Sequence, residues 1–273
     1  MTTAQKVIKY LAMAFAIFLV VNIITGICGA LFSVSYFLSG KPEKEMTEQI
    51  IGNSFTRLKV DISAAELEIK TGGKFGIETN HRYLICKENG EALEISETKP
   101  FFHSRSGMRV ILTIPKETVF EYADISTGAG SVTIAELWAN SLSINLGAGE
   151  LRAGRIEASY KAEIDGGAGS VTISGGRLNN ADIDMGIGEL NLTSELSGKS
   201  SIDYGVGETN LVLAGTHNDY RIELDKGIGE AWLDGKKMSD DAVYGGGGRH
   251  IEIDGGVGEL NITFTENSDE SIM

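Results

Sequence analysis

The sequence predicts an all-β protein: a single-stranded parallel β-helix, or β-solenoid, with coils of about 20 residues, preceded by one N-terminal transmembrane helix. Three observations predict this fold. A Gly–x–Gly unit recurs along the chain, glycine is frequent (35 residues) while proline is rare (3 residues), and a long run near the N-terminus carries no charge. Many glycines with few prolines indicate tight backbone corners between short strands rather than a disordered chain.

The uncharged run covers residues 10–40 and predicts a membrane-spanning helix. A bilayer span needs ~20 apolar residues, whereas the apolar part of a cleavable signal peptide has only ~7–15. Lys6 and Lys9 precede the run without an acid nearby, and the basic residues after it are interleaved with glutamates. We therefore expect residues 1–9 to be cytoplasmic, residues 41–53 to form a juxtamembrane stalk, and the remaining chain to be extracytoplasmic in a single-pass membrane protein.

The chain beyond the apolar run is strongly acidic. Residues 1–40 hold two of the 24 basic residues and no acid, so the remainder has a formal charge of 22 − 38 = −16. Such a domain is unsuited to nucleic acid and to anionic lipid surfaces. Cys28 lies in the apolar run and Cys86 stands alone, which excludes a disulfide within the domain and a cysteine-based metal site.

The Gly–x–Gly unit defines the period of the solenoid. Segments such as "DISTGAGSVTI", "DIDMGIGELNL" and "EIDGGVGELNI" share it, and successive central residues lie 19, 20, 19, 19, 22 and 29 positions apart. A period near twenty residues indicates stacked coils, and we expect right-handed winding because crossovers between parallel strands are overwhelmingly right-handed. The central residues are Ala129, Ala148, Ala168, Ile187, Val206, Ile228 and Val257.

Apolar residues four positions before the centre, and three and five positions after it, show the two-residue period of a strand on each side. The alternation shifts by one residue across the glycines, as at a corner or bulge, so we expect central residues such as Ile187 to face the core. The glycines are predicted to be structural corners because they tolerate φ > 0 and close packing against a neighbouring coil. They are Gly128, Gly130, Gly147, Gly149, Gly167, Gly169, Gly186, Gly188, Gly205, Gly207, Gly227, Gly229, Gly256 and Gly258.

The regular solenoid is expected over residues 121–264. Residues 54–120 are interpreted as irregular coils that cap it, beginning with a divergent copy of the unit, "LKVDISAAELEIK". The segment "GKKMSDDAVYGGGGRH" is predicted to be an insertion loop, and residues 265–273 a disordered tail.

The order of an apolar anchor, "LKVDISAAELEIKTGG", "RVILTIP" and a series of "DISTGAGSVTI" units resembles the bacterial "putative adhesin" family, a domain of unknown function with β-strand repeats. The resemblance covers about Ser54 to Phe264. It implies a β-helical domain of the cell envelope behind an N-terminal anchor or signal, and it brings no catalytic or binding residues.

Two acidic columns are the candidate metal ligands. Stacking the coils aligns an aspartate three positions before the centre and a glutamate two positions after it, and calcium would relieve the repulsion within such columns. The alternative is that both columns face water and keep the rod soluble. The residues are Asp165, Asp184, Asp203, Asp225, Asp254, Glu189, Glu208, Glu230 and Glu259.

No other chemistry is indicated by the sequence. The glycines recur without a following helix, unlike a phosphate-binding loop, and the four histidines have no spacing that suggests a site. We therefore expect no catalytic residue and no cofactor.

We interpret the chain as a non-catalytic binding, adhesion or scaffold module of the bacterial cell envelope, with an envelope glycan or protein as ligand. The alternative is an accessory or regulatory protein of an envelope-stress response. It would contact a partner membrane protein through Asn22, Gly26, Gly29 and Ala30 of its helix. A third interpretation, a cell-wall polysaccharide-active enzyme, would need a cleft with paired carboxylates held by long loops.

Overall fold

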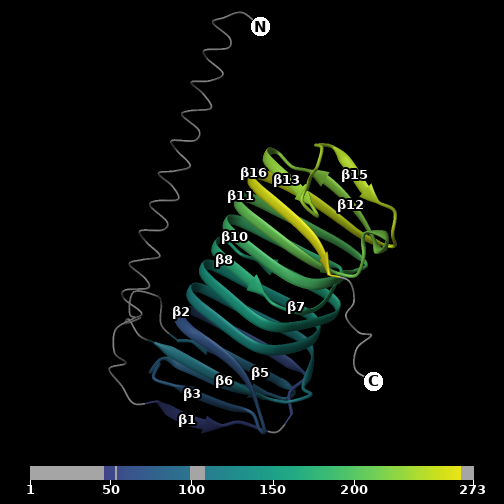
Figure 1. Cartoon of the computed structure of the whole chain (residues 1–273). Helices are drawn as coiled ribbons and strands as arrows, with labels where there is room; N and C mark the ends of the chain where they lie inside the picture. Colours follow the sequence, from purple (N-terminus) through teal and green to yellow (C-terminus); the bar gives the residue numbers. More distant parts are fainter. Residues whose placement is uncertain (1–45, 53, 99–107, 266–273) are drawn as a thin grey trace, which may run out of the picture.

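The computed structural model describes residues 46–52, 54–98 and 108–265 (Figure 1). The predicted transmembrane helix, residues 41–45 and 53 of the predicted stalk, and residues 266–273 of the predicted tail lie outside these residues. Within them no helix has the length and apolar character needed to cross a bilayer.

The described chain is all-β, and its strands form one 16-stranded sheet wound into a rod (Figure 1). A three-residue 3₁₀ turn, η2 His217–Asp219, is the only helix in the described ranges. The strands are β1 Thr47–Ile50, β2 Arg57–Gly72, β3 Gly76–Thr79, β4 Leu84–Asn89, β5 Ala92–Glu97, β6 Arg109–Pro115, β7 Val119–Asp165, β8 Ala168–Ile173, β9 Gly176–Asn179, β10 Ala181–Ser197, β11 Lys199–Ala214, β12 Tyr220–Asp225, β13 Ile228–Leu233, β14 Lys236–Lys237, β15 Ala242–Gly245 and β16 Arg249–Thr265.

The core is a stack of aliphatic residues from successive coils. In β10 the buried residues Ile183 and Leu192 alternate with exposed ones, and in the parallel pairing they align with Ile202 and Leu211 of β11. Equivalent positions thus lie above one another, so each coil buries its apolar side chains only together with its neighbours. The solenoid predicted from the repeat agrees with this register.

The divergent copy in β2 stacks as its sequence suggests. Ala64 aligns with Ala129, and Leu67 with Val132, although Ser63 stands where later coils have glycine.

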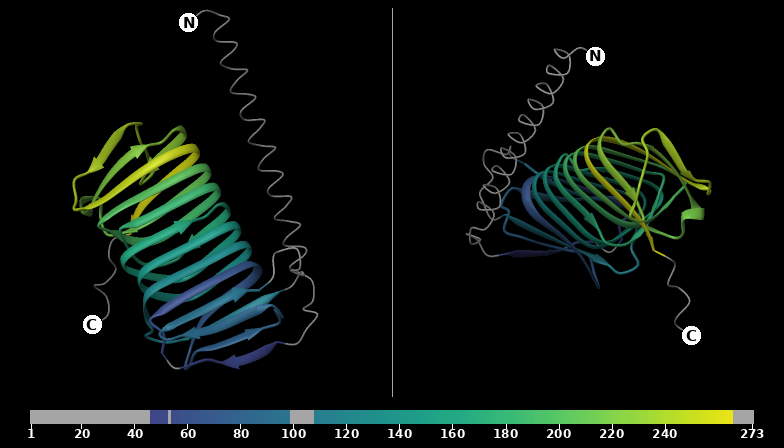
Figure 2. Two further views of the ribbon diagram at one scale, coloured as in Figure 1. Left: turned by 180° about the vertical axis from the view of Figure 1, so that it is seen from behind. Right: turned by 45° about the horizontal axis from the view of Figure 1, so that its top comes forward.

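The spatial order of the coils departs from the order of the repeats in the chain at both ends of the rod. The last strand, β16, pairs in parallel with β11 on one side and with β12 and β13 on the other. At the opposite end β2 lies between β7 and the later strands β5 and β6. Figures 1 and 2 show the yellow C-terminal strand inside the stack.

Antiparallel strands cover the outermost coils. At the C-terminal end β15 pairs with β12 and β14 with β13, and at the other end β3 and β1 follow β6. Part of the segment predicted as an insertion loop therefore forms edge strands. This arrangement gives both the first and the last long strand of the solenoid partners on both sides, and it leaves only short strands at the edges, which limits edge-to-edge pairing.

The residue between the two glycines lies on the outer rim and not in the core, so the expectation for Ile187 is wrong. Ile187 is half-buried, and Ile228 in the outermost coil is 67% exposed. A Cβ on Gly186 or Gly188 would point at carbonyl oxygens of the preceding coil, 2.5 Å and 1.7 Å away. The Cβ directions of the two glycines therefore run along the stack, and the in–out alternation of the strands does not extend across the corner.

Candidate functional site

The line of Gly–x–Gly corners forms one edge of the rod, here called the corner edge, and three columns of side chains run along it. The first, the Asp column, lies just before the corners. Asp165 aligns with Asp184, Asp184 with Asp203, Asp203 with Asp254, and Asp254 with Asp225. All are exposed except Asp203, which is half-buried. The strand register thus places five carboxylates above one another at the coil spacing of ~4.8 Å.

The second column, the aliphatic ridge, consists of the central residues Ile187, Val206, Val257 and Ile228 in that spatial order. Val257 is 38% exposed and Ile187 and Val206 are half-buried. In the coils toward β2 the same column holds only alanine, including Ala129 and Ala168. The ridge therefore rises above the corner edge only in the C-terminal coils.

The third, the Glu column, lies just after the corners and is continuous through Glu189, Glu208, Glu259 and Glu230. Its first three members are held by amides two residues further along their strands. Asn191 Nδ2 donates to Glu189 Oε1 at 2.7 Å, Asn210 Nδ2 to Glu208 Oε1 at 2.9 Å, and Asn261 Nδ2 to Glu259 Oε1 at 3.4 Å.

The three asparagines also bond to one another. Asn210 Nδ2 donates to Asn191 Oδ1 at 3.0 Å, and Asn261 Nδ2 donates to Asn210 Oδ1 at 3.1 Å. This Asn ladder orients the carboxylates without neutralising them, because its donors are uncharged amides.

The coils toward β2 carry a weaker and partly neutralised version of the corner edge. Glu150 forms an ion pair with Arg152, and Glu66 lies 3.7 Å from the Nε of Arg109. Ser126 and Asn145 interrupt the Asp column there and line an open hollow of ≈ 650 Å³.

Stacked carboxylates disturb each other's ionisation. The pKa of Asp203 is raised above its ordinary value by burial, by the negative charges of Asp254, Asp184 and Asp182, and by a hydrogen bond with Asp254. The folded state therefore disfavours the charged form of Asp203 at neutral pH, through burial first and through repulsion by its neighbours second.

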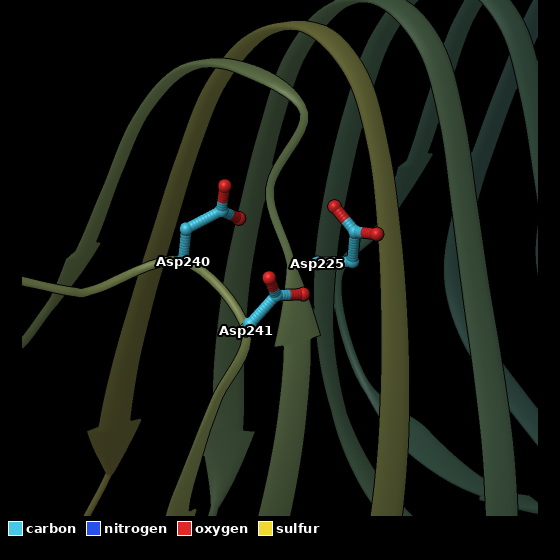
Figure 3. Close-up of side chains that lie close together, drawn as sticks. All are labelled: Asp225, Asp240 and Asp241. Atoms are coloured by element: carbon cyan, nitrogen blue, oxygen red, sulfur yellow. The ribbon is translucent and has the colours of Figure 1, made fainter.

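Three carboxylates gather at the outer end of the Asp column (Figure 3). Asp225, Asp240 and Asp241 are exposed and offer oxygens that all lie within 4.8 Å of one another. Asp225 Oδ1 accepts the N–H of Gly227 at 3.3 Å, and Asp240 Oδ1 accepts the N–H of Lys226 at 3.0 Å. Oxygen donors of this kind suit Ca²⁺.

The predicted calcium columns included Asp225 but not Asp240 or Asp241. These two aspartates belong to an insertion outside the repeat, so the repeat pattern could not align them with a column. The two columns themselves, predicted as one set of ligands, lie on either side of the aliphatic ridge.

The structure also contains a buried histidine–glutamate pair that the sequence did not indicate. His81 Nε2 lies 3.1 Å from Glu97 Oε1, which also accepts the N–H of Ser63 at 3.2 Å. Burial alone would raise the pKa of Glu97, but the hydrogen bonds from His81 and Ser63 hold it below its ordinary value. The pair satisfies the backbone of the first corner, between the segments of β2 that pair with β5 and β6.

Several known proteins are similar to this chain. The family model described as Toastrack DUF4097 matches residues 55–270. Among curated proteins none matches. The fold is similar to a "putative cell adhesion protein" from Clostridium sporogenes ATCC 15579, with 15% identity, a TM-score of 0.33, and coverage of 81% of this chain and 99% of that one.

A "putative adhesin" from Bacteroides fragilis NCTC 9343 shares 12% identity with a TM-score of 0.35, covering 82% of this chain and 99% of that one. Another "putative adhesin", from Parabacteroides distasonis ATCC 8503, shares 12% identity with a TM-score of 0.36, covering 82% and 98%.

Proposed function

The chain belongs to the Toastrack DUF4097 family, the β-repeat domain of unknown function that its sequence resembles, and on this basis we propose that it is a non-catalytic binding, adhesion or scaffold module of the bacterial cell envelope. The observation that carries the proposal is the corner edge, where the strand register holds equivalent side chains in unbroken columns. From β10 to β13 such a surface presents the same chemical group again at each successive coil, which suits the recognition of a long or repetitive partner.

The columns would act by multivalent contact. Each of the four coils formed by β10, β11, β16 and β12–β13 offers one aspartate, one aliphatic residue and one glutamate, and the Asn ladder fixes Glu189, Glu208 and Glu259 in place before binding. A preorganised array loses little conformational entropy on binding, so several weak contacts add up to a stable complex. This mechanism needs no bond to be made or broken.

We further propose that residues 10–40 anchor the protein in the cell membrane as a single span, with residues 1–9 in the cytoplasm and the solenoid outside. The uncharged length of this run supports a span, and the position of Lys6 and Lys9 supports the orientation. An acidic rod beside a membrane would be held away from anionic lipid headgroups and would stand free to meet a partner.

A retention assay tests the proposed function. The full chain in lipid nanodiscs is mixed with isolated cell walls and, separately, with the membrane-protein fraction reconstituted in liposomes, and each mixture is sedimented. Retention by one of the two, weakened when Glu189, Glu208 and Glu259 are all changed to glutamine, is the expected result. Absence of retention by both, or retention that the triple variant leaves unchanged, would contradict the proposed function. Retention by a reconstituted membrane protein would favour the regulatory alternative over adhesion to the wall.

A further inference from the structure

The corner edge changes along the rod, and its central residues and its two acidic columns change at the same point. In the four coils formed by β10, β11, β16 and β12–β13, the central residue is isoleucine or valine, and the columns before and after it are unbroken aspartate and unbroken glutamate. We call this part the C-terminal edge. In the coils toward β2 the central residue is alanine, and both acidic columns are interrupted.

The negative charges of the C-terminal edge are left unneutralised by the rest of the rod. Glu189, Glu208 and Glu259 are held by uncharged amides, and no residue of the Asp column forms an ion pair with another described residue. Glu230, at the outermost coil, is the exception, because Lys237 pairs with it. On the coils toward β2, by contrast, Glu150 and Glu66 have arginine partners.

We propose that the C-terminal edge docks an amphipathic α-helix of a partner protein, whose aliphatic stripe lies on the ridge and whose lysines or arginines flank the stripe on both sides. This inference rests on the proposed function as a binding module and names the chemistry of its partner. Burying the aliphatic ridge supplies the hydrophobic contribution, and the two acidic columns fix the orientation and exclude partners without basic flanks.

The spacing of the ridge favours a helix over a strand. Ridge residues follow one another at the coil spacing of ~4.8 Å, close to the ~5.4 Å rise of one helical turn. Over the three steps between Ile187 and Ile228, a helix drifts out of register by about 2 Å. A strand presents same-face side chains every ~6.7 Å and would drift by about 6 Å, more than one whole coil. The ridge, roughly 14 Å long, matches about ten helical residues.

Charge excludes a second copy of this chain as the occupant. Two C-terminal edges placed face to face would oppose the Asp and Glu columns of one molecule to those of the other, and the whole chain has a formal charge of −14. Opposing carboxylates at an interface cost several kcal/mol. The same argument excludes anionic polymers of the envelope at this position.

A synthetic peptide tests the proposal. The probe is a fluorescent helix of about 14 residues, with leucines three or four positions apart and lysines on both sides of the leucine stripe. Fluorescence anisotropy measures its binding to the full chain in zwitterionic nanodiscs, with empty nanodiscs as background. A peptide of the same composition in scrambled order tests for nonspecific attraction.

Two variants of the C-terminal edge and one matched control complete the design. Val206→Ser with Val257→Ser is expected to weaken binding at least about tenfold, and Glu208→Gln with Glu259→Gln about fivefold at low salt, with a flatter salt dependence. The control, Glu66→Gln with Glu150→Gln on the alanine half of the corner edge, is expected to change the affinity less than about twofold. Circular dichroism of each variant verifies folding.

Three results would overturn the proposal: no binding of the ordered peptide, equal binding of the scrambled peptide, or an equal loss of affinity in the control pair. The retention assay separates this failure from that of the proposed function. If wild-type protein is retained by the envelope fractions and the valine variant is retained equally well, only the helix-docking inference fails. If no fraction retains the wild type, the binding function itself fails.

Discussion

Replacing Gly188 by alanine should destabilise the solenoid far more than replacing glycines that lack its close contact, such as Gly235 and Gly248. Gly188 has φ +146°, and an added Cβ would lie 1.7 Å from the carbonyl oxygen of Gly169 in the preceding coil. Ordinary van der Waals contact begins at 3.4 Å, so the two coils must separate locally by about 3.4 − 1.7 = 1.7 Å. The adjacent hydrogen bond from the Ile187 N–H to the Gly167 oxygen, now 2.9 Å long, would not survive that separation.

The expected loss of stability is the sum of the cost of the left-handed φ and the cost of the hydrogen bonds that break. A left-handed φ costs a non-glycine residue roughly 1–2 kcal/mol. Each backbone hydrogen bond lost at the corner costs about 1 kcal/mol net and more if its groups stay buried. With two such bonds disrupted, Gly188→Ala should lower the free energy of unfolding by about 3–5 kcal/mol, a large part of the 5–15 kcal/mol typical of folded domains.

Alanine substitutions at three further glycines separate the effect of the Cβ clash from the effect of the left-handed φ. Gly186 has a clash at 2.5 Å without a left-handed φ, Gly235 has φ +73° with nothing within 4 Å of its Cβ position, and Gly248 has neither feature. Alanine should therefore cost about 2 kcal/mol at Gly186, about 1 kcal/mol at Gly235 and nearly nothing at Gly248. Urea unfolding of the full chain in neutral detergent, followed by circular dichroism, measures the series. A Gly188→Ala midpoint equal to that of Gly248→Ala would refute the account of the corners.

Three other changes probe the columns and the coil order. Asp203→Asn should stabilise the fold at pH 7 by up to about 1 kcal/mol, because it removes a repelling charge. Since the folded-state pKa of Asp203 is raised, its ionised carboxylate destabilises the wild-type fold fully above that pKa. This destabilisation disappears as the pH falls through the pKa and the carboxylate takes up a proton. The advantage of the variant should therefore shrink in unfolding experiments at pH 4, and Asp61→Asn, in the same column beside a serine, should give no such gain. Asn210→Ala should lower the free energy of unfolding by about 1–2 kcal/mol, because it breaks the Asn ladder at its middle, and an unchanged urea midpoint would contradict that role. Arg249→Gln should lower the free energy of unfolding by about 1–2 kcal/mol, because this side chain bonds Glu195 at 2.7 Å and the Ala214 oxygen at 3.2 Å where β16 enters the stack. The control Arg155→Gln, at a pair on the surface, should lower it by less than about 0.5 kcal/mol. Equal thermal midpoints for the two variants would argue against an anchoring role of Arg249.

The strands and their stacking could be predicted from the sequence because the alternation of apolar residues is strict on each side of the glycines. Residues such as Ile183 and Leu192 are buried for this reason. The same rule gave a wrong position for Ile187, because the alternation assumes that side chains point into or out of the rod. At the corner the Cβ directions of Gly186 and Gly188 run along the rod axis instead, and the residue between them lies on the outer rim.

The spatial order of the coils could not be predicted. The C-terminal coils carry the same columns, so β16 fits equally well onto β11 or onto β13 by pattern alone. The connections and the capping strands β14 and β15 decide the order, and these segments have no counterpart in the repeat. For the same reason the Asp240 and Asp241 carboxylates beside Asp225, and the His81–Glu97 pair, could not be found from the period.

Site-specific photocrosslinking in intact cells tests most directly the claim that the C-terminal edge is the binding surface. A benzophenone side chain replaces Val257 on the ridge, Ala148 on the alanine half of the corner edge, or Tyr160, which is 68% exposed and outside the corner edge. The account predicts one dominant adduct from position 257, weak or no adduct from positions 148 and 160, and loss of the dominant adduct when Glu208 and Glu259 are changed to glutamine. Equal adducts from all three positions, or a position-257 adduct that the glutamine changes leave intact, would contradict it.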